Sequence, residues 1–362
     1  MKAAIMTITD GQNYGNRLQN YALQMFLNEM GISAETVHNV INRVDEHCFK
    51  TRVLRFLLLC RARIIGKKNA EYQIMRYIRF RRFKDKYIQK SRFTLNSEDN
   101  LPEGFQQYYD FFITGSDQVW HPKWRGSAVD FLTFAPEHKR VSYAASFGVT
   151  NISEGQKKMY AQWLAGIKHL SVREPSGAKL IQELTGRTDS VVSLDPTFLL
   201  SASQWEAFAK EPKFLHINKP YILKYSLGAF THEEESFLNT CTTEKPLIDI
   251  TDKNSPAYMC DPTEFLWLIL NCDLLCTDSF HGTVFSLIFQ KPFIIFQRAI
   301  KGTDDSMYTR IENLLDLFDI HDREFSKLPS DPFLPLCVDV DKSLKIPREQ
   351  ARNYLKTALK SI

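Results

Sequence analysis

The sequence predicts an α/β protein with two doubly wound, Rossmann-like domains. Short apolar segments alternate with longer segments of helical periodicity along most of the 362 residues, a length typical of two domains. Many of the apolar segments end in polar or glycine-containing loops, where open parallel sheets bind ligands. The alternation restarts near residue 151. We therefore expect domains at 1–160 and 161–340, a cleft between them, and a C-terminal helix at 341–362 that packs back on the first domain.

The first predicted unit is a β-α-β motif. A β-favouring segment at 3–9 precedes a polar loop, and the helical stripe of 16–30 ends at Gly31, a natural C-terminal stop. A second strand follows at 34–40. The sequence predicts further strands of this domain at 109–114 and 140–145, and a largely helical segment at 43–93.

The second domain shows the same alternation. Its clearest helix start is Asp261-Pro-Thr-Glu264, with an aspartate cap, proline at the first helical position and glutamate at the third. The predicted helices are 153–166, 176–185, 262–271, 309–318 and about 346–360, and the predicted strands are 169–172, 190–194, 221–226, 247–251, 273–277 and 292–296.

The composition excludes several classes of protein. Hydrophobic residues make up 44% and charged residues 24%, which is typical of a soluble globular chain. No segment approaches the ~20 apolar residues of a membrane span, and the first residues resemble a strand rather than a signal peptide. Seven scattered cysteines without a CxxC pair indicate neither a zinc site nor a disulfide framework, so we expect a reducing cytoplasm. No cluster with ligand spacing suggests an essential metal.

The charge is distributed unevenly. The chain as a whole has a net charge of +4, but residues 43–92 contain 16 Lys and Arg against 4 Asp and Glu. Solvated helix faces are the default interpretation of this basic block. Nucleic-acid binding is not expected, because no nucleic-acid motif accompanies the block. Segment 50–65 combines cations with apolar residues, as interfacial helices do, so an anionic membrane surface is a third interpretation.

The segment Asp278-Ser-Phe-His-Gly-Thr-Val284 predicts an anion site. It lies between two apolar segments that are typical of a strand and a helix. Asp278 or Ser279 is expected to cap the helix, whose first N–H groups and dipole then favour an anion. Gly282 is expected to let a ligand approach the backbone. His281 has two interpretations, a histidine bonded to a nearby carbonyl or a functional imidazole.

Six motifs together resemble the polysaccharide pyruvyl transferase family. They are Asn13-Tyr-Gly-Asn-Arg-Leu-Gln19, Ile113-Thr-Gly-Ser-Asp-Gln-Val-Trp120, Ser142-Tyr-Ala-Ala-Ser-Phe-Gly148, Ser171-Val-Arg-Glu174, Ser193-Leu-Asp-Pro-Thr197 and Thr277-Asp-Ser-Phe-His-Gly-Thr283. The resemblance implies a fold similar to GT-B glycosyltransferases. It also implies transfer of the pyruvyl group of phosphoenolpyruvate, as a ketal, to a sugar of a surface polysaccharide such as a capsule or exopolysaccharide. Phosphoenolpyruvate is then a substrate, and no further cofactor is expected.

The expected donor site lies in the second half of the chain. Arg173, at the end of a strand, is expected to grip phosphate or carboxylate, although an ion pair with Glu174 or another carboxylate is the alternative. The resemblance suggests that His281 contacts the donor phosphate or transfers a proton. The expected donor-binding residues are Arg173, Ser279, Phe280, His281, Gly282, Ser306 and Arg310, and Arg298 is a further candidate near the same loop.

The expected acceptor site lies in the loops of the first half. Amide side chains beside an aromatic ring suit a sugar, whereas ordinary turn chemistry is the alternative. Asp117 is the candidate general base, so the expected catalytic set is Asp117, Arg173 and His281. The expected acceptor-binding residues are Asn13, Tyr14, Gly15, Asn16, Asp117, Gln118 and Trp120.

Two other functions remain open from the sequence. A glycosyltransferase that uses a nucleotide-sugar would place its diphosphate at a similar helix start. A non-catalytic protein that binds a glycan or phosphosugar would need the same residues without turnover. The expected location is the cytoplasm, with peripheral attachment to the inner face of the membrane if the acceptor is lipid-linked.

Overall fold

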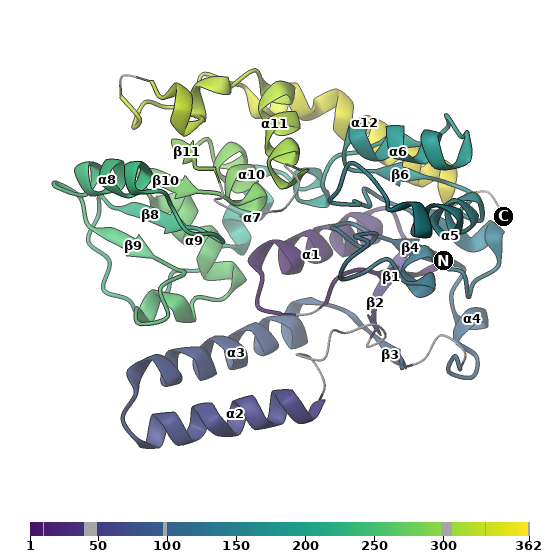
Figure 1. Ribbon diagram of the computed structural model, residues 1–362, viewed down its shortest axis with the longest axis horizontal. Helices are drawn as coiled ribbons and strands as arrows, with labels where there is room; N and C mark the ends of the chain where they lie inside the picture. Colours follow the sequence, from purple (N-terminus) through teal and green to yellow (C-terminus); the bar gives the residue numbers. More distant parts are fainter. Residues whose placement is uncertain (10, 40–48, 97–99, 298–305, 330, 361–362) are drawn as a thin grey trace. The chain divides into compact units, whose positions relative to one another are not determined.

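The computed structural model describes residues 1–9, 11–39, 49–96, 100–297, 306–329 and 331–360 (Figure 1). The chain divides into two compact units. Unit 1 comprises Met1–Thr51, Lys84–Leu200 and Leu344–Ile362, and unit 2 comprises Arg52–Phe83 and Ser201–Ser343. The division after residue 200 lies later than the expected boundary at 160, and residues 52–83 of the basic block belong to unit 2 rather than to the N-terminal domain.

Unit 1 is built on a parallel five-stranded sheet in the order β3-β2-β1-β4-β5. The chain order reverses between β1 and β4, so this unit has a topological switch point there. An unexpected member is β3, which occupies part of the segment predicted to be helical. Its alternating buried residues Phe93 and Leu95 give it a strand pattern. The strands are β1 Lys2–Met6, β2 Ser33–Asn39, β3 Lys90–Leu95, β4 Phe111–Thr114 and β5 Arg140–Ser142.

Two short strands extend this sheet beyond β5. The strands β6 Ser171–Val172 and β7 Val191–Val192 pair in parallel. Parallel bridges from Val141 to His169 and from Ala145 to Val172 connect β6 with the chain at β5. The carboxyl ends of β4, β6 and β7 therefore lie along one edge of unit 1.

One hydrophobic cluster of unit 1 lies between the sheet and two helices. Leu23, Phe26 and Leu27 of α1 are at most 2% exposed, and Leu355 and Leu359 near the chain's end belong to the same cluster. The C-terminal helix is also fixed by a hydrogen bond of 2.7 Å from the Tyr354 hydroxyl to the Ser142 carbonyl. The helices of this unit are α1 Tyr14–Glu29, α4 Phe105–Tyr108, α5 Glu154–Ala165, α6 Pro175–Thr185 and, from residue 344 onward, α12 Val340–Ala358.

Unit 2 contains a second parallel sheet, in the order β11-β10-β8-β9. The switch point of this sheet lies between β8 and β10. Helix α9 begins as predicted. The Asp261 side chain accepts from the N–H groups of Thr263 and Glu264, and the Glu264 side chain accepts from the Asp261 N–H. The strands are β8 Ile222–Tyr225, β9 Leu247–Asp249, β10 Leu274–Thr277 and β11 Phe293–Ile295, and the helices are α7 Ala202–Phe208, α8 His232–Cys241, α9 Pro262–Asn271, α10 Phe280–Ile288 and α11 Ser306–Phe318.

The basic block forms two adjacent helices, α2 Phe49–Ile64 and α3 Lys68–Tyr87 (Figure 1). Within unit 2, α3 is fixed by its arginines. Arg76 donates to the Tyr258 carbonyl at 2.7 Å, and Arg79 forms a hydrogen-bonded ion pair with Glu264. No helix in the described part of the chain is long and apolar enough to cross a membrane. The two parallel sheets with their helices confirm the predicted α/β class.

The packing of α12 in unit 1 can be tested with two substitutions on the same helix. Leu355 is fully buried, whereas Ile346 is 66% exposed. Leu355→Ala should lower the free energy of unfolding by about 2–5 kcal/mol because it removes buried methyl groups and leaves a cavity. Ile346→Ala should change it by less than ~0.5 kcal/mol. Urea denaturation followed by circular dichroism measures both, and equal losses would contradict this packing.

Candidate active site

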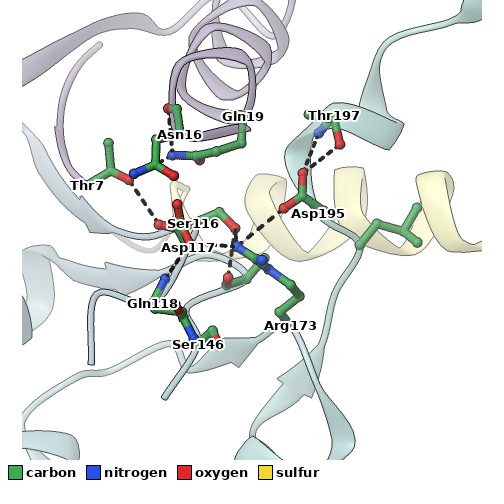
Figure 2. A network of polar contacts seen from close by, with 12 residues as sticks. Thr7, Asn16, Gln19, Ser116, Asp117, Gln118, Ser146, Arg173, Asp195 and Thr197 are labelled. Carbon is green, nitrogen blue, oxygen red and sulfur yellow. Dashed lines mark hydrogen bonds and ion pairs between the residues drawn. The ribbon is translucent and has the colours of Figure 1, made fainter. Parts of the chain in front are cut away.

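The candidate site of unit 1 lies where the loops after β1, β4, β6 and β7 meet (Figure 2). Thr7, after β1, donates its hydroxyl to the Ser116 carbonyl at 2.9 Å, and Gln19 of α1 donates to the Thr7 hydroxyl at 2.9 Å. Gly115 has a φ of +110°, and a Cβ there would lie 2.2 Å from the Tyr143 carbonyl oxygen. Only glycine fits this position, so the loop after β4 is closely held against the chain after β5.

Arg173 is the centre of this site. Its Nη2 donates to the Ser116 hydroxyl at 2.9 Å and lies 3.3 Å from Asp195 Oδ2 and 3.9 Å from Asp117 Oδ1. The Arg173 side chain is only 3% exposed. The structure thus gives Arg173 two carboxylate partners within its own unit. These contacts support the ion-pair alternative of the sequence analysis rather than a guanidinium open to a donor.

The electrostatics keep Arg173 charged. Burial by itself would lower the pKa of the guanidinium, but the carboxylates of Asp195, Asp117 and Glu174 outweigh burial and raise that pKa above its usual value. All three carboxylates are themselves buried. One buried cation therefore lies among three buried carboxylates. The guanidinium compensates the charge of the carboxylates, and they compensate its charge.

Asp195 has a larger role than the sequence indicated. The sequence analysis treated its segment only as part of a motif, but Asp195 Oδ1 accepts from the Thr197 N–H at 3.0 Å and from the Thr197 hydroxyl at 2.6 Å. Its Oδ2 faces Arg173. Burial raises the pKa of Tyr143 well above its usual range, and the negative charge of Asp195 raises it further. The Tyr143 phenol therefore stays protonated and donates to the Leu194 carbonyl at 3.2 Å.

Asp117 retains the geometry of a candidate base. Its φ of 76° lies in the left-handed region, which aspartate tolerates better than most residues. Oδ1 accepts from the Gln118 N–H at 2.8 Å. Oδ2 is buried and has no hydrogen-bond partner among the described residues. One carboxylate oxygen is thus held in place while the other retains its capacity to accept a proton.

The predicted acceptor residues divide into two groups. Asn13, Asn16 and Gln118 are partly exposed, and the Asn13 side chain caps α1 by accepting from the Asn16 N–H at 3.1 Å. Tyr14 and Gly15 are buried in the first turn of α1, so the prediction that they bind a sugar is not supported.

Trp120 requires the clearest correction. It is fully buried, its indole Nε1 donates to the Asp130 carbonyl at 3.1 Å, and its ring stacks on Phe131. A sugar therefore has no access to this ring. Trp124, which the sequence analysis missed, is 45% exposed and stacks on His121 with 3.4 Å between ring centroids. The only sequence signal for it was its place at the end of the same loop.

The candidate site of unit 2 lies at the start of α10, after β10. Ser279 is the N-cap, and its side chain accepts from the Gly282 N–H at 3.4 Å. Asp278 does not cap this helix. Its two carboxylate oxygens instead accept from the N–H groups of Leu227 and Gly228, both at 2.7 Å. Asp278 thereby ties the loop after β8 to the end of β10, at the switch point of the sheet.

Gly282 has a packing role that the sequence analysis did not predict. A Cβ on Gly282 would lie 2.6 Å from Thr277 Oγ1. The Thr277 hydroxyl cannot move easily, because it donates to the Tyr225 carbonyl at 2.6 Å and accepts from the Ser279 N–H at 3.0 Å. The glycine therefore lets α10 approach β10, whereas the expectation that it also lets a ligand approach the backbone stays a prediction.

His281 and Arg310 both lie beside Phe280. The His281 ring contacts the Phe280 ring edge-on with 5.2 Å between centroids, and the Arg310 guanidinium lies 5.8 Å from the centroid of the same ring. Phe280 is partly exposed, whereas His281 and Arg310 are 8% and 7% exposed. Arg298 lies outside the described residues. Ser306 begins α11, and its side chain is also outside them.

No group of three potential ligands among His, Cys, Asp and Glu gathers in the part of the chain that the structure describes. The two sites contain charged side chains and a helix start. Unit 1 supplies the carboxylate of Asp117, and unit 2 supplies the imidazole of His281, the guanidinium of Arg310 and the start of α10.

The role of Gly282 can be tested by adding one methyl group. Gly282→Ala should lower the free energy of unfolding by about 1–3 kcal/mol, because the new Cβ collides with the fixed Thr277 side chain. Gly155→Ala in α5 is the matched control, since nothing lies within 4 Å of its Cβ position. Alanine favours the helix there, so the control should be neutral or stabilising. Similar effects in thermal unfolding would contradict the close approach.

The ion-pair cluster can be tested by removing its cation. Arg173→Met should lower the free energy of unfolding by about 3–5 kcal/mol, because it leaves Asp117 and Asp195 buried without compensation. Adding Asp195→Asn should restore part of this loss, since one uncompensated charge is removed. Chemical denaturation of the two single variants and the double variant measures the coupling. Additive losses would show that the two side chains do not interact.

Comparisons with known proteins show which family the chain belongs to. The model of the family described as polysaccharide pyruvyl transferase matches residues 13–298, which is more than half of the 362 residues. No curated protein matches the sequence.

Several solved structures are similar at low identity. They include MnaA from S. aureus with UDP (12% identity, TM-score 0.48, 100% of this chain and 97% of that chain), a UDP-GlcNAc 2-epimerase from Neisseria meningitidis bound to UDP-GlcNAc (9%, 0.42, 98% and 100%) and MurG from Acinetobacter baumannii (9%, 0.34, 99% and 94%).

The family model covers both candidate sites, the loops around Asp117 and Arg173 in unit 1 and the start of α10 in unit 2. The chain therefore belongs to the polysaccharide pyruvyl transferase family and is a transferase.

Proposed function

We propose that the protein transfers the pyruvyl group of phosphoenolpyruvate to two hydroxyls of one sugar in a surface polysaccharide or its lipid-linked precursor. The observation that carries this proposal is the convergence of His281, Arg310 and the capped start of α10 around Phe280. A cation and helix N–H groups beside an imidazole suit a substrate with a phosphate and a carboxylate.

The reaction sets the chemical requirements. One acceptor hydroxyl adds to C2 of phosphoenolpyruvate, and C3 gains a proton and becomes a methyl group. A second hydroxyl of the same sugar then displaces phosphate from C2 and closes the ketal. Over both steps, one hydroxyl proton ends on C3 and the other leaves with phosphate. The site therefore needs a base near the acceptor, which takes the hydroxyl proton and passes it to C3, and an acid near the phosphate.

Asp117 and His281 fit these two requirements. Asp117 Oδ2 is an acceptor without a hydrogen-bond partner in the described chain, so we assign it the acceptor hydroxyl proton. His281 lies in the first turn of a helix that favours anions, so we assign it contact with the phosphate and its protonation on departure. Arg173 acts as a positioning residue in this proposal, because it holds Asp117 and Asp195 rather than the donor.

The acceptor side of the proposal uses the exposed polar and aromatic groups of unit 1. Asn13, Asn16 and Gln118 offer amides for sugar hydroxyls. Trp124 offers the exposed ring face that the sequence analysis had assigned to Trp120. The proposal needs no metal or further cofactor, so turnover should persist in EDTA. It places the protein in the cytoplasm, where phosphoenolpyruvate is available, and at the inner membrane face if the acceptor is lipid-linked.

The donor assignment is tested by thermal shift with phosphoenolpyruvate beside a panel of nucleotide-sugars. A ligand at a hundred times its Kd stabilises the folded state by about 2.7 kcal/mol. We expect a rise in Tm with phosphoenolpyruvate, absent in His281→Ala and retained in the matched control His232→Ala, an exposed histidine of the same unit. Transfer of radiolabelled pyruvyl groups to polysaccharide should be lost in the first variant alone.

Other outcomes would overturn the proposal. A shift with nucleotide-sugars alone would make the protein a glycosyltransferase that uses the same helix start for a diphosphate. A shift with phosphoenolpyruvate but no turnover on any saccharide would make it a binding protein. Full activity of His281→Ala would remove the role assigned to that residue.

A further inference from the structure

We propose that the end of the α2–α3 hairpin is a docking surface for an anionic lipid bilayer. The surface, here called the α2 face, consists of Leu57, Leu58, Arg61, Ile64 and Ile65. It does not depend on the chemistry proposed above, because none of these residues belongs to either candidate site. The argument uses the exposure of the α2 face, the way the hairpin is held, and its charge.

The α2 face is an exposed apolar stripe. Leu57, Leu58, Ile64 and Ile65 are 58%, 55%, 86% and 66% exposed. Positions i, i+1, i+4, i+7 and i+8 of an α-helix cover an arc of roughly 120°, so these side chains and Arg61 share one side of α2. Ile65 continues the helix by donating its N–H to the Arg61 carbonyl at 3.1 Å. An ordinary protein surface exposes large aliphatic side chains singly, whereas this side of α2 exposes four of them together.

Other side chains of α2 face α3. The Phe56 and Tyr77 rings lie 6.2 Å apart, and Arg63 forms an ion pair of 3.6 Å with Glu71. At the turn between the helices, Gly66 has a φ of +84°, and the Lys67 N–H donates to the Ala62 carbonyl at 3.0 Å, as in a Schellman motif. These contacts hold the hairpin without using the α2 face.

Helix α3 anchors the hairpin to the rest of unit 2. Within unit 2, Arg76 stacks on Tyr258 and donates to its carbonyl, and Arg79 pairs with Glu264. Phe80 and Phe83 are at most 3% exposed. The buried side of the hairpin is therefore on α3, whereas α2 presents its apolar stripe to solvent in this chain.

The charge of α2 indicates which partner binds the α2 face. Its sixteen residues include five Lys and Arg and no Asp or Glu, and Arg61 lies within the apolar stripe. A second copy docked by two-fold symmetry would place these cations against one another. An anionic bilayer offers hydrocarbon to the leucines and isoleucines and phosphate groups to the arginines, which is the pattern of an interfacial helix. Because no described helix can span a membrane, this attachment would be peripheral.

The test uses the full-length protein and vesicles. Sedimentation with vesicles of phosphatidylglycerol and phosphatidylcholine in equal parts should bind the protein, and vesicles of phosphatidylcholine alone should bind it on the order of tenfold more weakly. Raising the salt concentration should weaken binding, because surface charges are screened. The variant Leu57→Ser/Leu58→Ser/Ile64→Ser/Ile65→Ser should lose binding, and Arg61→Gln/Lys67→Gln should weaken it several-fold.

The matched control is Leu247→Ser/Leu334→Ser, which removes aliphatic side chains that are 40% and 47% exposed elsewhere in unit 2. It should bind like the unmodified protein, and circular dichroism should show that every variant stays folded. Equal binding by the quadruple variant would overturn the proposal, as would equal binding to neutral vesicles. A dimer in analytical ultracentrifugation that the quadruple variant alone dissolves would assign the face to a second copy instead.

Discussion

The buried charge of Arg173 is the constraint on which the site of unit 1 depends. A guanidinium inside a protein is costly unless carboxylates and hydrogen bonds compensate it, and here Asp195, Asp117 and Ser116 do so. These partners come from loops after different strands. The ion pairs therefore fix the loops relative to one another, and they set the orientation of the carboxylate that we assign as the base.

Parallel sheets explain where both sites occur. In each unit the strand order reverses at one point, between β1 and β4 in unit 1 and between β8 and β10 in unit 2. In open parallel sheets, ligands bind beside the carboxyl ends of the strands at such a point. Ser116 and Thr7 meet at the first point, and Asp278 joins Leu227 and Gly228 at the second. The helix start at Ser279 follows directly from the second switch point.

The motif residues of this family serve packing as well as chemistry. Gly282 allows α10 to approach Thr277, Gly115 fits where a Cβ would collide with the Tyr143 carbonyl, and Trp120 fills the core. Such residues position their polar neighbours through packing. For this reason a motif identifies the location of a site more reliably than it identifies the members that bind. Trp124, outside the family motifs, presents the exposed ring that Trp120 lacks.

The sequence by itself determined the α/β class, the family and the capped helix starts, because periodicity and cap residues are local signals that neighbouring residues specify. It also placed Asp117 and Arg173 in loops after strands and His281 in the first turn of a helix. Only the tertiary structure decided that Arg173 pairs with Asp195, that Trp120 is covered by Phe131, and that residues 52–83 belong with unit 2. These outcomes depend on contacts between residues far apart in the chain, and neither periodicity nor composition records which distant side chains will meet.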